Sequence, residues 1–246
     1  MRLGLAVVAM VVGGGCKVDV AVGIEADRSG AGRVTVTAQL DRAAVQRAGD
    51  LSTQLRTGDL VAAGWDVDPP KPVAQGGVQL VATRPFRDPA EAERILQTIT
   101  GANGPVRGFT LTSKRSYFST ETTLRGVVDL TAGIEAFTDA DLQAKLGGVP
   151  LGLTAPQLER EALAPLDQIF GLQVAVSMPG DVTANTPTVT DDDAVWPVRL
   201  GQEVAIEAVS TTSNRTNIAF LVVAAVAALG FLSTSGLAIV RRRGRR

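Results

Sequence analysis

The chain has no histidine and one cysteine among its 246 residues, and aromatic residues make up only 4% of it. Without histidine, it cannot build a Ser-His-Asp triad or a histidine metal site from its own residues. A single cysteine excludes an internal disulfide. Metal ligands would have to be oxygen atoms, and the alternating acids of a calcium loop are absent. We therefore expect no enzyme activity, no catalytic residue, no metal and no cofactor.

Basic charge is scarce in the body of the chain. Residues 17–217 carry 18 Lys or Arg and 25 Asp or Glu, a net charge of −7, whereas five Arg lie in the last six residues. A domain that binds nucleic acid shows a basic face rather than a basic terminus. We therefore expect no nucleic-acid partner.

Two apolar runs flank this body. Residues 3–12 follow Arg2 and precede three glycines; the run is too short to span a bilayer and has the parts of a secretory signal peptide. Residues 218–240 contain no charged residue, and this run of 23 residues is long enough to span hydrocarbon about 30 Å thick. Because the Arg cluster follows it, we expect the C-terminus on the cytoplasmic side.

The single cysteine, Cys16, directly follows Gly13, Gly14 and Gly15. Bacterial lipoprotein signal peptides end in an apolar residue, two small residues and a Cys whose thiol receives diacylglycerol. Gly14 and Gly15 fit this lipobox, and Gly13 departs from the usual apolar residue. An unpaired thiol outside the cell is usually avoided, so we predict that Cys16 is lipidated. The alternative is an ordinary signal peptide with a cysteine nearby by chance.

These features predict five segments. Residues 1–15 are a lipoprotein signal peptide, and residues 16–209 form an extracytoplasmic domain. Residues 210–217 are a juxtamembrane spacer, residues 218–240 a transmembrane helix, and residues 241–246 a basic cytoplasmic tail. The predicted location is the cell membrane, which the chain contacts through its lipid anchor and one spanning helix.

Periodicity predicts the fold of the domain. Val18, Val20, Val22 and Ile24 alternate with polar or small residues, and the same pattern over residues 33–40 predicts an antiparallel hairpin. Helical spacing follows over residues 41–64, and residues 88–101 read as a helix with Asp88 as N-cap. The end of the domain reads as three strands. We expect an α+β fold, a largely antiparallel sheet with helices packed on one side, plus the C-terminal transmembrane helix.

Four aromatic residues are candidates for contact with an apolar ligand. For Trp196 the alternative of core packing at a strand end is favoured, and the other aromatics equally suit a core. The amphipathic residues 155–170 are either a helix docked on the sheet or a lid over an apolar cavity. Asp191, Asp192 and Asp193 suit a solvated turn better than a cation site. The ligand candidates are Trp196, Phe109, Phe118 and Phe170.

Three stretches together resemble the LppM lipoprotein family of mycobacteria and their relatives. They are residues 16–38, residues 124–132 and residues 176–210, and the last contains Pro179-Gly180, Trp196, Leu200, Gly201 and Ser210 in the family's order. The segment of residues 134–170 is longer than the corresponding segment in compact members of the family. The resemblance implies a non-enzymatic envelope protein with a signal peptide, a lipobox Cys, an external α/β domain, a spanning helix and an apolar pocket for lipids such as envelope glycolipids.

Two functions are compatible with these observations. The first is a cell-envelope lipoprotein whose external domain binds an apolar or lipid ligand. The alternative is a protein-interaction or scaffolding module of a membrane complex, whose protein partner the sequence does not identify. An enclosed apolar surface favours the first function, and a specific crosslinked partner favours the second.

Overall fold

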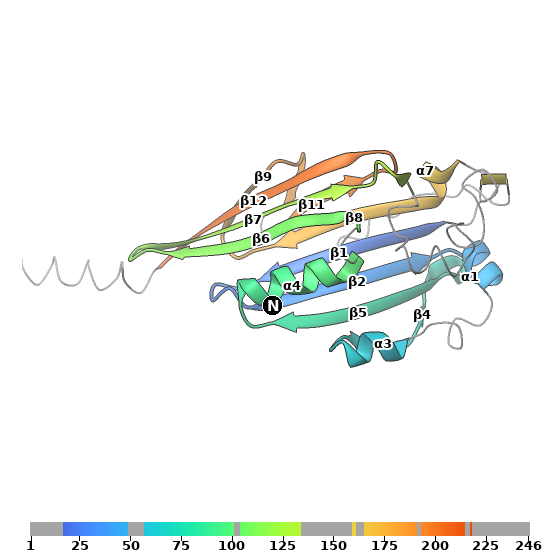
Figure 1. The fold of residues 1–246 in the computed structure, drawn as a ribbon, viewed down its shortest axis with the longest axis horizontal. Coiled ribbons are helices and arrows are strands. Elements are labelled where there is room, and N and C mark those ends of the chain that lie inside the picture. The colour runs from blue at the N-terminus through green and yellow to red at the C-terminus, as the bar shows by residue number, and fades with distance from the viewer. Residues whose placement is uncertain are drawn as a thin grey trace, which may run out of the picture.

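The structure is a computed structural model that describes residues 17–48, 57–100, 104–133, 159–160, 165–190, 193–214 and 217. Two β-sheets face each other, and helix α4 lies beside the smaller sheet, over the same face of the larger one (Figure 1). The space between these layers contains the hydrophobic core.

The large sheet has eight strands in the order β10-β11-β8-β1-β2-β5-β3, with β4 also paired to β5. All of its pairings are antiparallel except β1 with β8, which are parallel. The strands are β1 (Val18–Ala26), β2 (Gly32–Leu40), β3 (Asp66–Val67), β4 (Lys71–Pro72), β5 (Val78–Phe86), β8 (Phe170–Ser177), β10 (Thr188–Thr190) and β11 (Asp193–Val198).

The small sheet has four antiparallel strands in the order β6-β7-β12-β9. The strands are β6 (Val106–Arg115), β7 (Ser119–Asp129), β9 (Asp181–Ala184) and β12 (Glu203–Ser213). β12 pairs with β7 from Glu203 opposite Asp129 to Ser213 opposite Ser119. Four residues of the predicted spacer, 210–213, therefore belong to this strand.

The helices of the described residues are short, apart from α4. They are α1 (Arg42–Ala48), α3 (Thr57–Ala62), the 3-10 helix η1 (Ala74–Gly76), α4 (Pro89–Thr100) and α7 (Leu166–Ile169). The prediction for α4 is confirmed: the Asp88 carboxylate accepts a hydrogen bond from the Glu91 N–H at 2.8 Å, as an N-cap does. Asp41 caps α1 in the same way, through the Ala44 N–H at 2.7 Å.

The core lies between the inner faces of the two sheets and α4. In β1, Val22 and Ile24 are buried and point inward, whereas the alternating Ala21, Gly23 and Glu25 lie on the outer face. The predicted hairpin of residues 17–40 is confirmed, since β1 and β2 pair along their whole length, from Val18 opposite Leu40 to Ala26 opposite Gly32.

The expected layer of helices on one side of a single sheet is wrong. A second sheet covers much of the inner face, because β7 and β12 each bury one alternating set of residues, including Leu124, Val128, Ile206 and Ala208, against the large sheet. Period-two alternation predicts that one face of a strand is buried, but it does not say what covers that face. The chain is therefore mainly β, with α4 filling only part of the second layer.

Several predictions fall outside the described residues. These are the signal peptide and Cys16, most of residues 134–164, Asp191 and Asp192, and the predicted span 218–240. Within the described part of the chain, no helix combines the length and apolar composition needed to cross a membrane, so the spanning helix in the predicted fold class has no support there.

Candidate functional site

The inner face of the large sheet continues past its core as an apolar surface that is only partly buried. Strand register places side chains in two adjacent rows on this face. Phe170, Val18, Leu40 and Val78 form the first row, across β8, β1, β2 and β5. The second row contains Leu172, Val20, Ala38 and Leu80 on the same four strands.

We call the partly exposed members of these rows the apolar patch. Leu172 is buried and is not counted in it. Each remaining side chain is intermediate in exposure, although the strand alternation points it inward. The patch consists of Val18, Val20, Ala38, Leu40, Val78, Leu80 and Phe170.

Among the described elements, α4 covers the other half of this face. α4 follows β5 after Phe86 and runs back over the ends of β5 and β2, where Val34 and Phe86 are buried (Figure 1). It continues the core with its own buried Ile95 and Leu96. At the opposite end of these strands, beside α1 and α7, the described residues include no helix of comparable length.

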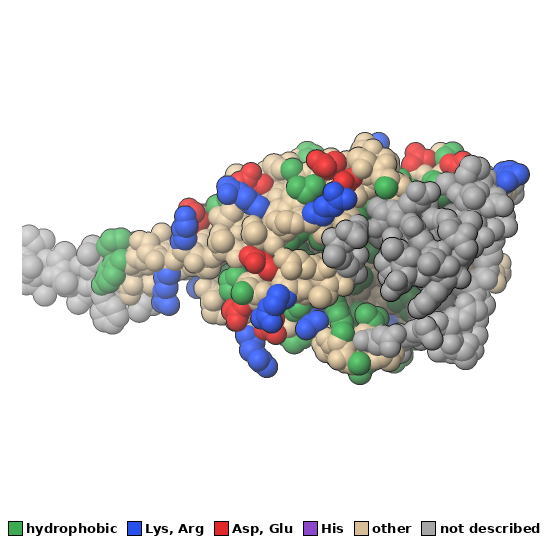
Figure 2. Space-filling view, in the orientation of Figure 1, with side chains coloured by type: hydrophobic (Ala, Val, Ile, Leu, Met, Phe, Trp, Pro, Cys, Tyr) green, Lys and Arg blue, Asp and Glu red, His purple; other side chains and the backbone are tan. Residues whose placement is uncertain are grey.

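The space-filling view shows hydrophobic atoms within a hollow past the end of α4, next to the part of the chain that is not described (Figure 2). Partly exposed apolar side chains that lie side by side on neighbouring strands differ from scattered ones, because one ligand can cover several of them at once. Burying apolar surface contributes roughly 25 cal/mol per Å². An apolar chain lying across both rows would therefore be stabilised without any polar contact.

Two ion pairs lie at this end of the molecule. Lys17 forms an ion pair with Asp19 at 2.9 Å, and Arg107 forms one with Asp129 at 3.2 Å. A hydrogen bond from the Thr131 hydroxyl holds the pKa of Asp129 below its usual value, with help from the Thr131 N–H and Arg107. Over the described residues, no group of three or more Cys, Asp or Glu is placed to bind a metal ion.

The structure does not bring the four predicted aromatic residues together. Trp196 is 2% exposed, and its indole N–H donates a 2.7 Å hydrogen bond to the Asn185 side-chain oxygen, so it packs in the core. Phe109 is also buried in the core. Phe170 lies in the apolar patch, beside Val18.

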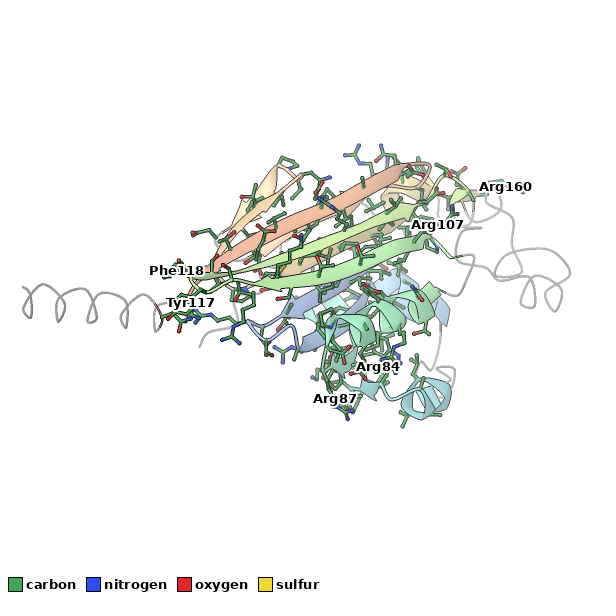
Figure 3. The ribbon with its side chains drawn as sticks, turned by 60° about the vertical axis from the view of Figure 1, so that its left-hand side comes forward. Arg84, Arg87, Arg107, Tyr117, Phe118 and Arg160 are labelled. Atoms are coloured by element: carbon green, nitrogen blue, oxygen red, sulfur yellow. The ribbon has the colours of Figure 1, made fainter. Side chains whose placement is uncertain are left out.

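Phe118 lies at the other end of the molecule. It sits next to Tyr117 at the end of the β6–β7 hairpin, away from Arg107 and Arg160 (Figure 3). The two rings are in edge-to-face contact, with centroids 4.9 Å apart. Of the four candidates, only Phe170 therefore belongs to the patch.

Sequence reasoning identified five of the seven patch residues, Phe170 as a ligand candidate and four others by their alternation. It placed Val18, Val20, Ala38 and Leu40 on one face of a hairpin, which the register confirms. Val78 and Leu80 had no such assignment. The pairing of β1 with β8 joins segments about 150 residues apart, and no local signal indicates it.

Comparisons with known proteins give one structural likeness. No family model and no curated protein match the chain. The chain is similar to the NMR structure of the folded domain of LppM from Mycobacterium tuberculosis, with 14% sequence identity, over 84% of this chain and 96% of that chain, at a TM-score of 0.45.

Proposed function

We propose that this chain is a membrane-attached envelope lipoprotein whose domain binds a lipid or another long apolar ligand on the apolar patch. The observation that carries the proposal is the continuous apolar surface across β8, β1, β2 and β5, partly exposed within a folded sandwich. Each of these side chains is of intermediate exposure, and a contiguous accessible apolar surface on a folded domain is where ligands or partners bind.

Attachment through Cys16, with the domain on the outer side of the cell membrane, is part of this proposal. Its support is the sequence before Lys17, where three small residues lead to the single cysteine. Family membership among LppM-like lipoproteins belongs to the proposal as well, and so does the absence of a catalytic step. An envelope glycolipid is one ligand that would fit, since the patch selects for its acyl chains and not for its headgroup.

The test compares two neighbouring residues of β2 that point to opposite faces of the sheet. Ala38 lies in the patch, and Thr37 lies on the outer face, with a similar intermediate exposure. The full chain and its Ala38→Trp and Thr37→Trp variants are purified from membranes, and lipids that copurify are extracted and identified by mass spectrometry. The intact mass of the chain reports in the same samples whether Cys16 carries diacylglycerol.

We expect wild type and Thr37→Trp to carry the same lipid class, and Ala38→Trp to carry at least threefold less, because the larger side chain fills the patch. Unfolding temperatures of the three proteins show whether Ala38→Trp is folded. Where it is not, Leu80→Ser, which makes the patch polar without adding volume, replaces it. A folded wild-type chain without lipid, and without uptake of added phospholipid, contradicts the proposal and leaves the interaction module as the alternative.

A further inference from the structure

The end of the β6–β7 hairpin exposes two large aromatic side chains. Tyr117 is 60% exposed and Phe118 is 45% exposed, and few large apolar side chains in the described residues are as open. The two rings touch each other and extend from the narrow end of the molecule (Figure 3). Aromatic rings in this position lower the solubility of the domain and do not pack in its core. This indicates that they contact a partner outside the domain.

Two cations precede the aromatic pair. Lys114 and Arg115 are exposed, and neither forms an ion pair with another described residue. Glu121 lies opposite Lys114 on β7, and the hairpin end of residues 112–122 has a net charge of +1. The surface therefore combines aromatic rings with a small excess of positive charge, although the chain between residues 17 and 217 is acidic.

Hydrogen bonds connect this hairpin end to the last described residues of the chain. The Asn214 N–H donates to the Phe118 carbonyl oxygen at 2.7 Å, and the Asn217 side-chain amide donates to the Tyr117 carbonyl oxygen at 2.7 Å. The Ser116 N–H donates to the Ser119 carbonyl oxygen at 2.7 Å and closes the turn. The aromatic pair is thus held beside Asn217, directly before the 23-residue uncharged run of the sequence.

We propose that the end of the β6–β7 hairpin is a membrane-contact surface, in which Tyr117 and Phe118 enter the interface of an anionic bilayer and Lys114 and Arg115 contact its phosphate groups. Tyrosine prefers the headgroup level of a bilayer, where its apolar ring and its hydroxyl both find partners, and the adjacent Phe118 ring adds apolar surface that the interface can bury. A Lys or Arg close to an anionic membrane surface is attracted to its phosphate groups. This surface is separate from the apolar patch, which lies at the opposite end of the strands.

The test places a reporter at the hairpin end and a matched reporter elsewhere. Tyr117→Trp and Phe118→Trp variants of the full chain are reconstituted in vesicles of phosphatidylcholine and phosphatidylglycerol, with or without brominated acyl chains. Val61→Trp on α3 is the control, because Val61 is 58% exposed, as open as Tyr117. Trp65 and Trp196 are buried and give the same background in every variant.

We expect brominated lipid to quench the tryptophan at 117 or 118 at least twofold more than the tryptophan at 61, with a blue-shifted emission. Equal quenching at the three positions overturns the proposal. So does an emission change that appears without bromine and depends on protein concentration, since it would indicate contact with a second copy of the chain. A lipid bound at the apolar patch lies at the other end and does not quench a tryptophan at 117, so this result is independent of the proposed function.

A charge-reversal variant tests the contribution of Lys114 and Arg115 to membrane binding. Lys114→Glu with Arg115→Glu, built into the Tyr117→Trp chain, should reduce quenching in vesicles that contain phosphatidylglycerol and leave it unchanged in pure phosphatidylcholine. Salt should weaken binding of the parent chain in the same way, because it screens exposed charges. Quenching that responds neither to the substitutions nor to salt overturns the assignment of Lys114 and Arg115 to phosphate groups.

Discussion

The side chain of Asn185 shows how one polar residue fixes a buried aromatic. Its oxygen accepts hydrogen bonds from the Trp196 indole N–H at 2.7 Å and from the Glu207 N–H at 3.0 Å, and its amide donates to the Ala205 carbonyl oxygen at 2.9 Å. The only polar atom of the indole is thereby satisfied in the core. Trp196 therefore supports the packing of β11 against β12, and it is unavailable to a ligand.

A second residue-scale effect concerns acid stability. Because hydrogen bonds from Thr131 lower the pKa of Asp129 from its ordinary value of 3.8, the charged form stabilises the folded state. This contribution is present above the ordinary pKa and is lost as the pH falls through the lowered pKa of the folded state. The Asp129→Asn variant lacks it, and Asn keeps an oxygen that can accept the Thr131 bonds.

We expect wild type to lose more stability than Asp129→Asn between pH 6 and pH 3, as measured by urea unfolding of the full chain. Asp181→Asn is the control, because Asp181 is exposed and forms no ion pair with the described residues. Equal losses in wild type and Asp129→Asn would show that the Thr131 hydrogen bonds do not affect the titration of Asp129.

At the scale of elements, the β6–β7 hairpin depends on a glycine opposite an aromatic ring. The Phe109 ring lies directly over Gly126, and a Cβ added there would come within 2.6 Å of the ring atom Cγ. The register shifts between Arg107 and Thr110, where Gly108 adopts a φ of 58°. This irregularity accompanies the inward position of Phe109, which is buried next to α4 and β7.

Replacing Gly126 with Ala should destabilise the chain by about 1–3 kcal/mol, the usual cost of an added group in a packed core. Chemical unfolding measures the effect. Gly58→Ala on α3 is the control, since an added Cβ there meets nothing within 4 Å. The double variant Gly126→Ala with Phe109→Leu should recover part of the loss, because the smaller side chain leaves room. A Gly126→Ala chain as stable as wild type contradicts this packing.

At the scale of the whole molecule, the second layer formed by the described residues covers only part of the inner face, and the apolar patch lies outside that part. The small sheet and α4 bury Val22 to 6% exposure, whereas Val18, on the same strand and the same face, stays partly exposed. Two valines that are four residues apart on one face of β1 therefore differ in solvent exposure. The end of the β6–β7 hairpin lies at the far end of the sandwich from Val18, so the two proposed lipid contacts are separated along the strands (Figure 1).

Val22→Ala should cost roughly 1–3 kcal/mol of unfolding free energy, because it opens a cavity in a closed core. Val18→Ala should cost less than about 1 kcal/mol in the lipid-free chain, because water reaches that side chain already. Urea unfolding of both variants in the same buffer provides the comparison. Equal losses would mean that the inner face is closed along its whole length, and the patch would no longer be a candidate site.

Local features of this protein follow from its amino-acid sequence alone. Alternation fixed the β1–β2 hairpin and its inward residues, and Asp88 fixed the start of α4, because these signals act between residues close in the chain. The elements that cover the large sheet, in contrast, depend on tertiary packing. The parallel pairing of β1 with β8, the small sheet facing them, and the partly exposed rows all depend on contacts between distant segments. Packing and the entropy of loop closure decide which of these contacts form. A periodic pattern shows which face of a strand is apolar, but it does not show which other element packs against that face.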